Sequence, residues 1–68
     1  MKDSIQIVGF GIITEKQAMF EIGYFAALMQ EAYKTGKFSI AMQAMRNMKP
    51  FVDALLKKGY SIEQILPR

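Results

Sequence analysis

Two long stretches of helical hydrophobic periodicity, at residues 15–34 and 40–58, constrain the fold of this chain most strongly. In both stretches apolar residues recur every three or four positions, the pattern of an amphipathic α-helix. The connection between them is short and contains Gly36. At 1.5 Å per residue the helices would be about 30 Å and 28 Å long. Near-equal lengths and a short turn predict an antiparallel helical hairpin.

Start and stop signals lie at the ends of both stretches. Thr14, followed three residues later by Gln17, predicts a capping box at the start of the first helix. Gly36 is a good C-cap residue and predicts the end of that helix. Ser39 is the expected N-cap of the second helix, which Gly59 would end after two lysines.

Pro50 lies inside the second stretch. A helix-interior proline deletes a hydrogen bond and costs about 3 kcal/mol. The apolar pattern nevertheless keeps its phase on both sides of Pro50, which falls on the solvent-facing side where the freed carbonyl of Arg46 can meet water. We therefore interpret the stretch as one bent helix. The alternative is a break, with Asn47 capping a new helix.

The outer segments are shorter. Residues 4–10 alternate at first and are rich in β-branched types, which predicts a strand, the only one we identify. Residues 1–13 form an extended N-terminal arm in this interpretation. At the other end, Ser61 and Gln64 predict a capping box for a short helical turn over residues 62–66. Residues 1–68 are expected to form one mainly α-helical domain.

Each helix presents one apolar stripe, and we expect the two stripes to form a shared core. The stripe of the first helix comprises Ala18, Ile22, Phe25, Met29, Ala32 and Tyr33. The stripe of the second comprises Ala41, Met45, Met48, Val52, Leu55 and Leu56.

The composition predicts a homodimer. The chain has 68 residues, of which 51% are hydrophobic, and it contains neither Cys nor His. A domain of this size buries only about 60% of its unfolded surface and usually needs disulfides, a metal or a second subunit. Without cysteines or histidines, oligomerisation is the remaining support.

Several apolar side chains fall outside the two stripes, and we expect them to contact a partner protein. Phe20 is almost opposite the stripe of its helix, with Tyr24 nearby. In the alternative interpretation the N-terminal segment folds back and covers these groups. The candidate partner contacts are Phe10, Phe20, Tyr24, Met42 and Phe51.

No motif predicts an enzyme. Nucleophilic catalysis usually needs a base within reach of a Ser, Thr or Cys, and this chain has no His or Cys. Its six carboxylates form no spaced metal-ligand cluster, so we expect no catalytic, metal or cofactor site. No stretch approaches the roughly 20 apolar residues of a membrane span, and the absence of Cys fits a cytoplasmic location.

The leading hypothesis is therefore a small regulator that binds a protein target, such as an inhibitor, adaptor or antirepressor-like chain. A subunit of a larger assembly would explain the apolar surplus equally well.

DNA binding is the alternative function. The order of strand, helix, Gly-containing turn and helix resembles the ribbon-helix-helix repressors, in which strands from two chains pair and enter the major groove. The resemblance covers the layout of residues 2–58 only. A long first helix, the Gly9-Phe10-Gly11 segment and Pro50 depart from it. Candidate nucleic-acid contacts under this hypothesis are Lys2, Ser4, Gln6, Lys37, Arg46 and Lys49.

Overall fold

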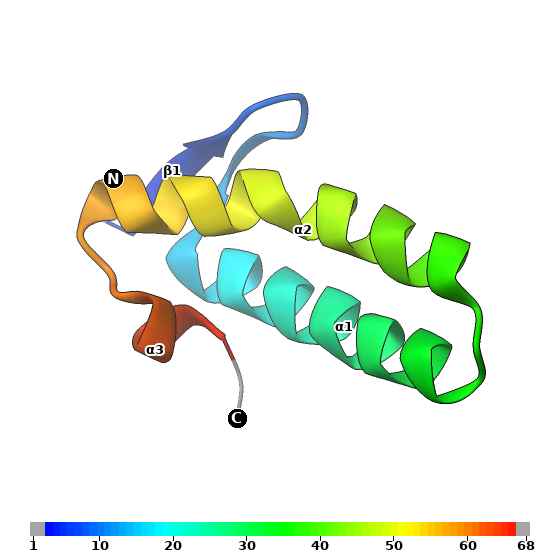
Figure 1. The fold of residues 1–68 in the computed structure, drawn as a ribbon. Helices are drawn as coiled ribbons and strands as arrows, with labels where there is room; N and C mark the ends of the chain where they lie inside the picture. The colour runs from blue at the N-terminus through cyan, green and yellow to red at the C-terminus, as the bar shows by residue number, and fades with distance from the viewer. Residues whose placement is uncertain (1–2, 67–68) are drawn as a thin grey trace.

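The computed structural model describes residues 3–66 and contains a β-hairpin and an antiparallel helix pair. The elements are β1 (Ser4–Ile7), β2 (Gly11–Thr14), α1 (Glu15–Lys34), α2 (Phe38–Lys58) and α3 (Ile62–Ile65). The two long helices lie side by side, and the hairpin crosses one face of the pair near the start of α1 and the end of α2 (Figure 1). The predicted helical hairpin is therefore confirmed.

The ends of α1 follow from local hydrogen bonds. The hydroxyl of Thr14 accepts from the Gln17 backbone N–H at 3.0 Å, as predicted. The Gln17 side-chain N–H donates to Glu21, and its oxygen does not accept from the Thr14 N–H, so the predicted capping box is not complete. At the other end, Gly36 adopts a φ of +73°, and the Lys37 N–H reaches back to the carbonyl of Ala32 at 2.8 Å. This is the Schellman arrangement, which satisfies carbonyls left over at a helix end.

Helix α2 begins at Phe38, two residues before the start that an N-cap at Ser39 implies, and passes through Pro50 without interruption. Its N-cap is Lys37, with no side-chain cap bond, so the prediction of Ser39 as N-cap is wrong. The single-helix interpretation of Pro50 is confirmed over the break. Gly59 ends the helix with a φ of +113°. The capping box of Ser61 and the short helix that follows it are confirmed.

The expectation of a single strand is wrong. The strand predicted over residues 4–10 ends at Ile7, and Gly11–Thr14 forms a second, antiparallel strand that pairs Ile5 with Ile13. The Phe10 N–H donates to the Ile7 carbonyl at 3.0 Å, and Gly9 has a φ of +78°. Positive φ at the third residue of this turn, with none at Val8, defines type II geometry, which favours glycine at that position.

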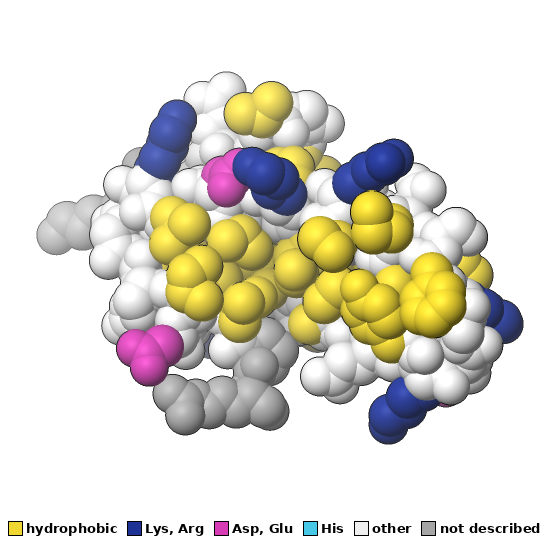
Figure 2. Space-filling model, viewed as in Figure 1, with side chains coloured by type: hydrophobic (Ala, Val, Ile, Leu, Met, Phe, Trp, Pro, Cys, Tyr) yellow, Lys and Arg dark blue, Asp and Glu magenta, His cyan; other side chains and the backbone are white. Residues whose placement is uncertain are grey.

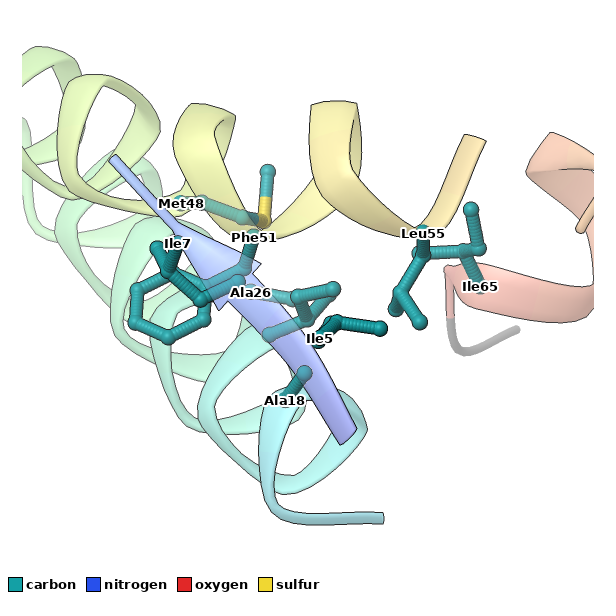
Figure 3. Packing of buried hydrophobic residues seen from close by; sticks show 9 residues of the cluster. Ile5, Ile7, Ala18, Ala26, Met48, Phe51, Leu55 and Ile65 are labelled. Carbon is teal, nitrogen blue, oxygen red and sulfur yellow. The ribbon is translucent and has the colours of Figure 1, made fainter. Parts of the chain in front are cut away.

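The core lies where the hairpin meets the helices. Ile7 is almost fully buried, and Figure 3 shows it with Ile5, Phe51 and Leu55 among side chains that converge from β1, both long helices and α3. Because Ile5 and Ile7 alternate with polar residues, the strand presents them to the helices on one face. Strand β1 thus contributes Ile5 and Ile7 to the core, and Ile13 of β2 packs against it.

The predicted stripe of α2 is shifted toward the hairpin. Ala44 and Phe51 are buried, whereas Met45 and Leu56 remain 41% and 39% exposed. Periodicity in the sequence places the centre of the buried face at the middle of the apolar stripe. In the structure the hairpin covers the side of the stripe that contains Phe51, so the buried face is displaced toward that side. The same effect leaves the opposite flank uncovered. On α1 the predicted Tyr33 is also exposed, and Phe25 and Met29 are only partly buried. Ala26 is buried in addition to the expected Ala18, Ile22 and Ala32.

Candidate protein-binding surfaces

A band of hydrophobic side chains follows the junction of α1 and α2 on the face away from the hairpin (Figure 2). Met45 and Leu56 are about three helical turns apart and therefore lie on one line of α2, with half-buried Val52 between them. Near the helix–helix turn, the rings of Tyr33 and Phe38 lie 6.0 Å apart. We define the seam surface as Tyr33, Phe38, Met42, Met45 and Leu56, all of which are exposed.

A second apolar group occupies the side of α1 that faces away from α2. We define this α1 outer surface as Phe20 and Tyr24. Leu28 is also exposed, but it lies beside α2, in a hollow that it shares with Ile40 and Gln43. Phe20 is 70% exposed, so the hairpin does not cover it and the alternative of a folded-back arm over Phe20 does not hold. The Tyr24 ring meets the edge of Phe25 at 5.4 Å, which fixes Tyr24 against the core while its outer side stays exposed.

Phe10 and Phe51 share a contact but differ in burial. Phe51 is only 4% exposed, so its assignment to a partner-contact surface is wrong. Its ring packs edge-on against Phe10 at 5.2 Å and tilted against Phe25 at 6.1 Å. Phe10, at the tip of the hairpin turn, covers one side of Phe51 and keeps most of its own surface exposed.

A groove of about 560 Å³ lies between β1 and the outer side of α2. The hairpin forms one wall, with Gln6 and Val8. Helix α2 contributes Pro50, Ala54 and also Leu56, which therefore borders both the groove and the seam surface. The cationic residues at this groove are Arg46, Lys49 and Lys57. Lys49 is paired with Asp53 at 2.8 Å.

A polar cluster links the start of α1 to the end of α2. Glu15 accepts a 2.5 Å hydrogen bond from the Tyr60 hydroxyl and pairs with Lys58 at 3.0 Å. The hydrogen bond from Tyr60, and to a smaller extent the contact with Lys58, hold the pKa of Glu15 below its usual range. The same hydrogen bond raises the pKa of Tyr60. Sequence reasoning missed this cluster because its members lie 43 to 45 positions apart, and no local pattern brings them together.

The candidate nucleic-acid contacts do not form one surface. Lys2 lies outside the described residues. Gln6, Arg46 and Lys49 meet at the groove, whereas Lys37 lies at the helix–helix turn, roughly 14 Å from Arg46 along the helix axis at 1.5 Å per residue. Ser4 is half-buried, and its carbonyl accepts from Lys58 at 3.0 Å. Strand β1 also pairs inside its own chain, unlike the two-chain ribbon of ribbon-helix-helix repressors.

Within residues 3–66, no group of three or more acidic side chains could hold a metal ion. None of the described helices combines the length and the apolar content that a membrane crossing requires. No protein family matches the chain, no curated protein is similar to it in sequence, and no solved structure matches its fold. The surfaces themselves are therefore the basis for a functional proposal.

Proposed function

We propose that this chain is a small non-catalytic regulator that works as a homodimer and acts by binding a protein target. The observation that supports this proposal is the distribution of large hydrophobic side chains. In residues 3–66, thirteen of them are exposed, whereas the buried hydrophobic set has twelve members and five of these are alanines. Exposed apolar side chains that gather into a band, as Figure 2 shows along the junction of α1 and α2, are typical of interaction surfaces.

The shape of the molecule supports a second subunit on the seam surface. The Cα atoms extend over 41 × 25 × 15 Å, so the fold is thin in one direction. The hairpin covers one face of the helix pair. Figure 2 shows a band of hydrophobic side chains open on the opposite face. In the proposed dimer, the seam surfaces of two copies pack across a two-fold axis and create a four-helix layer between two hairpins.

The α1 outer surface remains free in such a dimer and is the proposed contact for the target. Phe20 and Tyr24 point away from α2, so packing of the seam surfaces does not cover them. Aromatic side chains are enriched among residues that dominate binding energy, because they bury a large area with few rotatable bonds. Phe10 at the hairpin turn is a further candidate contact, since its ring is mostly exposed.

Equilibrium sedimentation tests the dimer. The wild-type chain should have a mass near 15 kDa at micromolar concentration, twice the 7.7 kDa of one chain. The double variant Met45→Glu with Leu56→Glu should sediment as a monomer with an unchanged far-UV circular dichroism spectrum. The matched control is Gln43→Glu with Gln30→Glu, which adds the same charge at exposed polar positions. A wild-type chain that stays monomeric contradicts the dimer proposal.

Phe20→Asp tests the target contact. This variant should keep the helical spectrum and the dimer mass, since Phe20 lies outside the core and the seam surface. The wild-type chain is first used to capture and identify the target protein from the native host. This target should bind the variant at least tenfold more weakly, because aromatic hot-spot residues contribute about 2 kcal/mol or more. Lys16→Asp serves as a control on an exposed position of the same helix. Equal binding by Phe20→Asp contradicts this assignment.

A further inference from the structure

The outer edge of β1 has no strand partner among the described residues. The Glu15 N–H donates to the Asp3 carbonyl at 2.6 Å, so odd-numbered residues of this strand direct their backbone groups toward β2. Bonding direction alternates along an antiparallel strand, and Ser4 and Gln6 therefore direct their N–H and C=O groups outward. Lys58 donates to the Ser4 carbonyl, which leaves Gln6 as the open centre of this edge.

The groove between β1 and α2 lies beside this open edge. The hairpin projects beyond α2 in Figure 1. The groove therefore has the hairpin on one side and the surface of α2 that contains Pro50 and Ala54 on the other. A smaller hollow of about 240 Å³ continues the groove toward Ser4. At about 3.3 Å per residue, the stretch from Ser4 to Val8 could pair with four or five residues of an extended peptide.

The charges at the groove are mainly positive. Three cationic side chains and one carboxylate line it, and that carboxylate, Asp53, is already paired with Lys49. Arg46 and Lys57 have no ion-pair partner among residues 3–66. A ligand that follows the groove would pass these two cations, and opposite charge on the ligand would be favourable.

We propose that the β1–α2 groove binds an extended acidic peptide segment of a partner protein. The peptide pairs its backbone with Gln6 as a third strand and places carboxylates beside Arg46 and Lys57. Addition of a strand to an open sheet edge is an established mode of peptide recognition. This inference rests on the proposed protein-binding function and names the chemistry of the partner.

Two other occupants fit the groove less well. A second copy of this chain, paired edge to edge across a two-fold axis, would bring two cationic linings together, and like charges oppose association. A nucleic acid carries negative charge but has no peptide backbone, so the open groups of Gln6 would gain no strand partner from it. The combination of an open strand edge with unpaired cations favours the acidic peptide.

Calorimetric titration of the full chain with a blocked eight-residue peptide of alternating Glu and Thr tests the proposal. Saturable binding is expected at low salt, with weaker affinity as salt increases, because exposed charges are screened. The same peptide with Lys in place of Glu should not bind at the same concentrations. No binding of the acidic peptide at millimolar concentration overturns the proposal.

Two pairs of variants separate the strand edge from the charges. Gln6→Pro removes the outward N–H at a position where an edge strand tolerates proline, and Gln6→Ala keeps the backbone intact. We expect Gln6→Pro to bind about fivefold to tenfold more weakly than Gln6→Ala, the effect of one lost hydrogen bond. Arg46→Glu with Lys57→Glu should weaken binding at least tenfold, whereas Lys16→Glu with Lys37→Glu, the same charge change outside the groove, should not.

Amide chemical shifts of the wild-type chain provide a readout that does not depend on the folding of any variant. Peptide-induced changes should centre on residues 4–8 and on residues 46–57. Changes confined to other parts of the chain, equal affinity of the charge-reversed variant, or tighter binding of a short DNA duplex than of the peptide would each overturn the proposal. Sedimentation of the same samples separates the two proposals. A dimer that does not bind the peptide contradicts only the proposal for the groove, and a monomer that binds the peptide contradicts only the proposal of a homodimer.

Discussion

The two flanks of α2 begin from similar sequence and end in different environments. One flank contains Phe51 and is buried beneath the hairpin, whereas the other contains Met45 and Leu56 and faces outward. All three residues are large and hydrophobic, so composition does not explain the difference. The cause is the β-hairpin, which packs Phe10 against Phe51 and adds Ile5 and Ile7 to the same core cluster. A short chain can therefore finish its core on one side of a helix and leave the other side available for association.

The largest contrast is expected between truncations on the two flanks. Phe51→Ala should lower the free energy of unfolding by about 3–5 kcal/mol, because it removes a buried ring and leaves a cavity. Leu56→Ala, on the exposed flank, should cost about 1 kcal/mol or less in the monomer. Urea unfolding followed by circular dichroism at low protein concentration measures both. Equal losses would show that the flanks do not differ.

The hairpin itself provides the second contrast. Ile7→Ala should lower the free energy of unfolding by about 2–5 kcal/mol, since Ile7 is almost fully buried against the helices. Ile12→Ala, on the outer face of β2, should change it by only about 0.5 kcal/mol, as at other surface positions. The same urea experiment applies. If Ile7→Ala proved neutral, the hairpin could not be the element that orders the Phe51 flank.

The Glu15 cluster predicts a pH dependence at the hairpin end of the molecule. The pKa of Glu15 is lowered in the folded chain, mainly by the Tyr60 hydroxyl and then by Lys58. The unfolded chain therefore binds the proton more tightly, and stability that is present above pH 4.5 is lost as pH falls through the folded pKa. Tyr60→Phe should make the thermal midpoint less sensitive to pH in this acidic range.

A matched effect of opposite direction applies at high pH. The pKa of Tyr60 is raised above 10.0, so its contribution is present below that value and is lost as pH rises through the folded pKa. The primary measurement for both predictions is thermal unfolding of the wild-type chain and of Tyr60→Phe, with the acidic range testing the effect on Glu15. Identical pH profiles for the two chains would contradict a stabilising role for this hydrogen bond.

The smallest expected effect concerns the ion pair of Lys49 and Asp53. Both side chains are mostly exposed, and such pairs one turn apart on a helix contribute about 0.3–0.5 kcal/mol. Lys49→Ala should therefore shift the thermal midpoint only slightly, with a smaller shift at high salt. A loss comparable to that of Phe51→Ala would mean that the outer side of α2 is covered in solution.

Much of the fold could be predicted because its signals are local. The bounds of α1, the role of Thr14 and the Ser61 cap each depend on residues within about one helical turn. The passage of α2 through Pro50 follows from apolar periodicity along a single helix. The second strand was missed because Gly11–Thr14 is only four residues long and carries no clear alternation. Short apolar segments of this kind take their structure from the partner they pair with, which no local pattern reveals.

The surfaces were only partly predictable for a related reason. Phe20, Tyr24 and Met42 are exposed, as their angular positions on the helices indicated. Phe51 looked similar by the same criterion but is covered by the hairpin, a contact between segments distant in sequence. The β1–α2 groove was not predicted at all, since it depends on where the strand crosses α2.

Oxidation of individual methionines at increasing protein concentration tests the central claim most directly, namely that a second copy covers the open flank of α2. Met45 is exposed in one chain and Met48, one turn away, is buried, so Met48 serves as the internal control. With dilute peroxide and peptide mass spectrometry, Met45 should oxidise rapidly at nanomolar concentration and become protected as the mass doubles, while Met48 stays protected throughout. Rapid oxidation of Met45 at every concentration, with the mass of a single chain, would contradict the account.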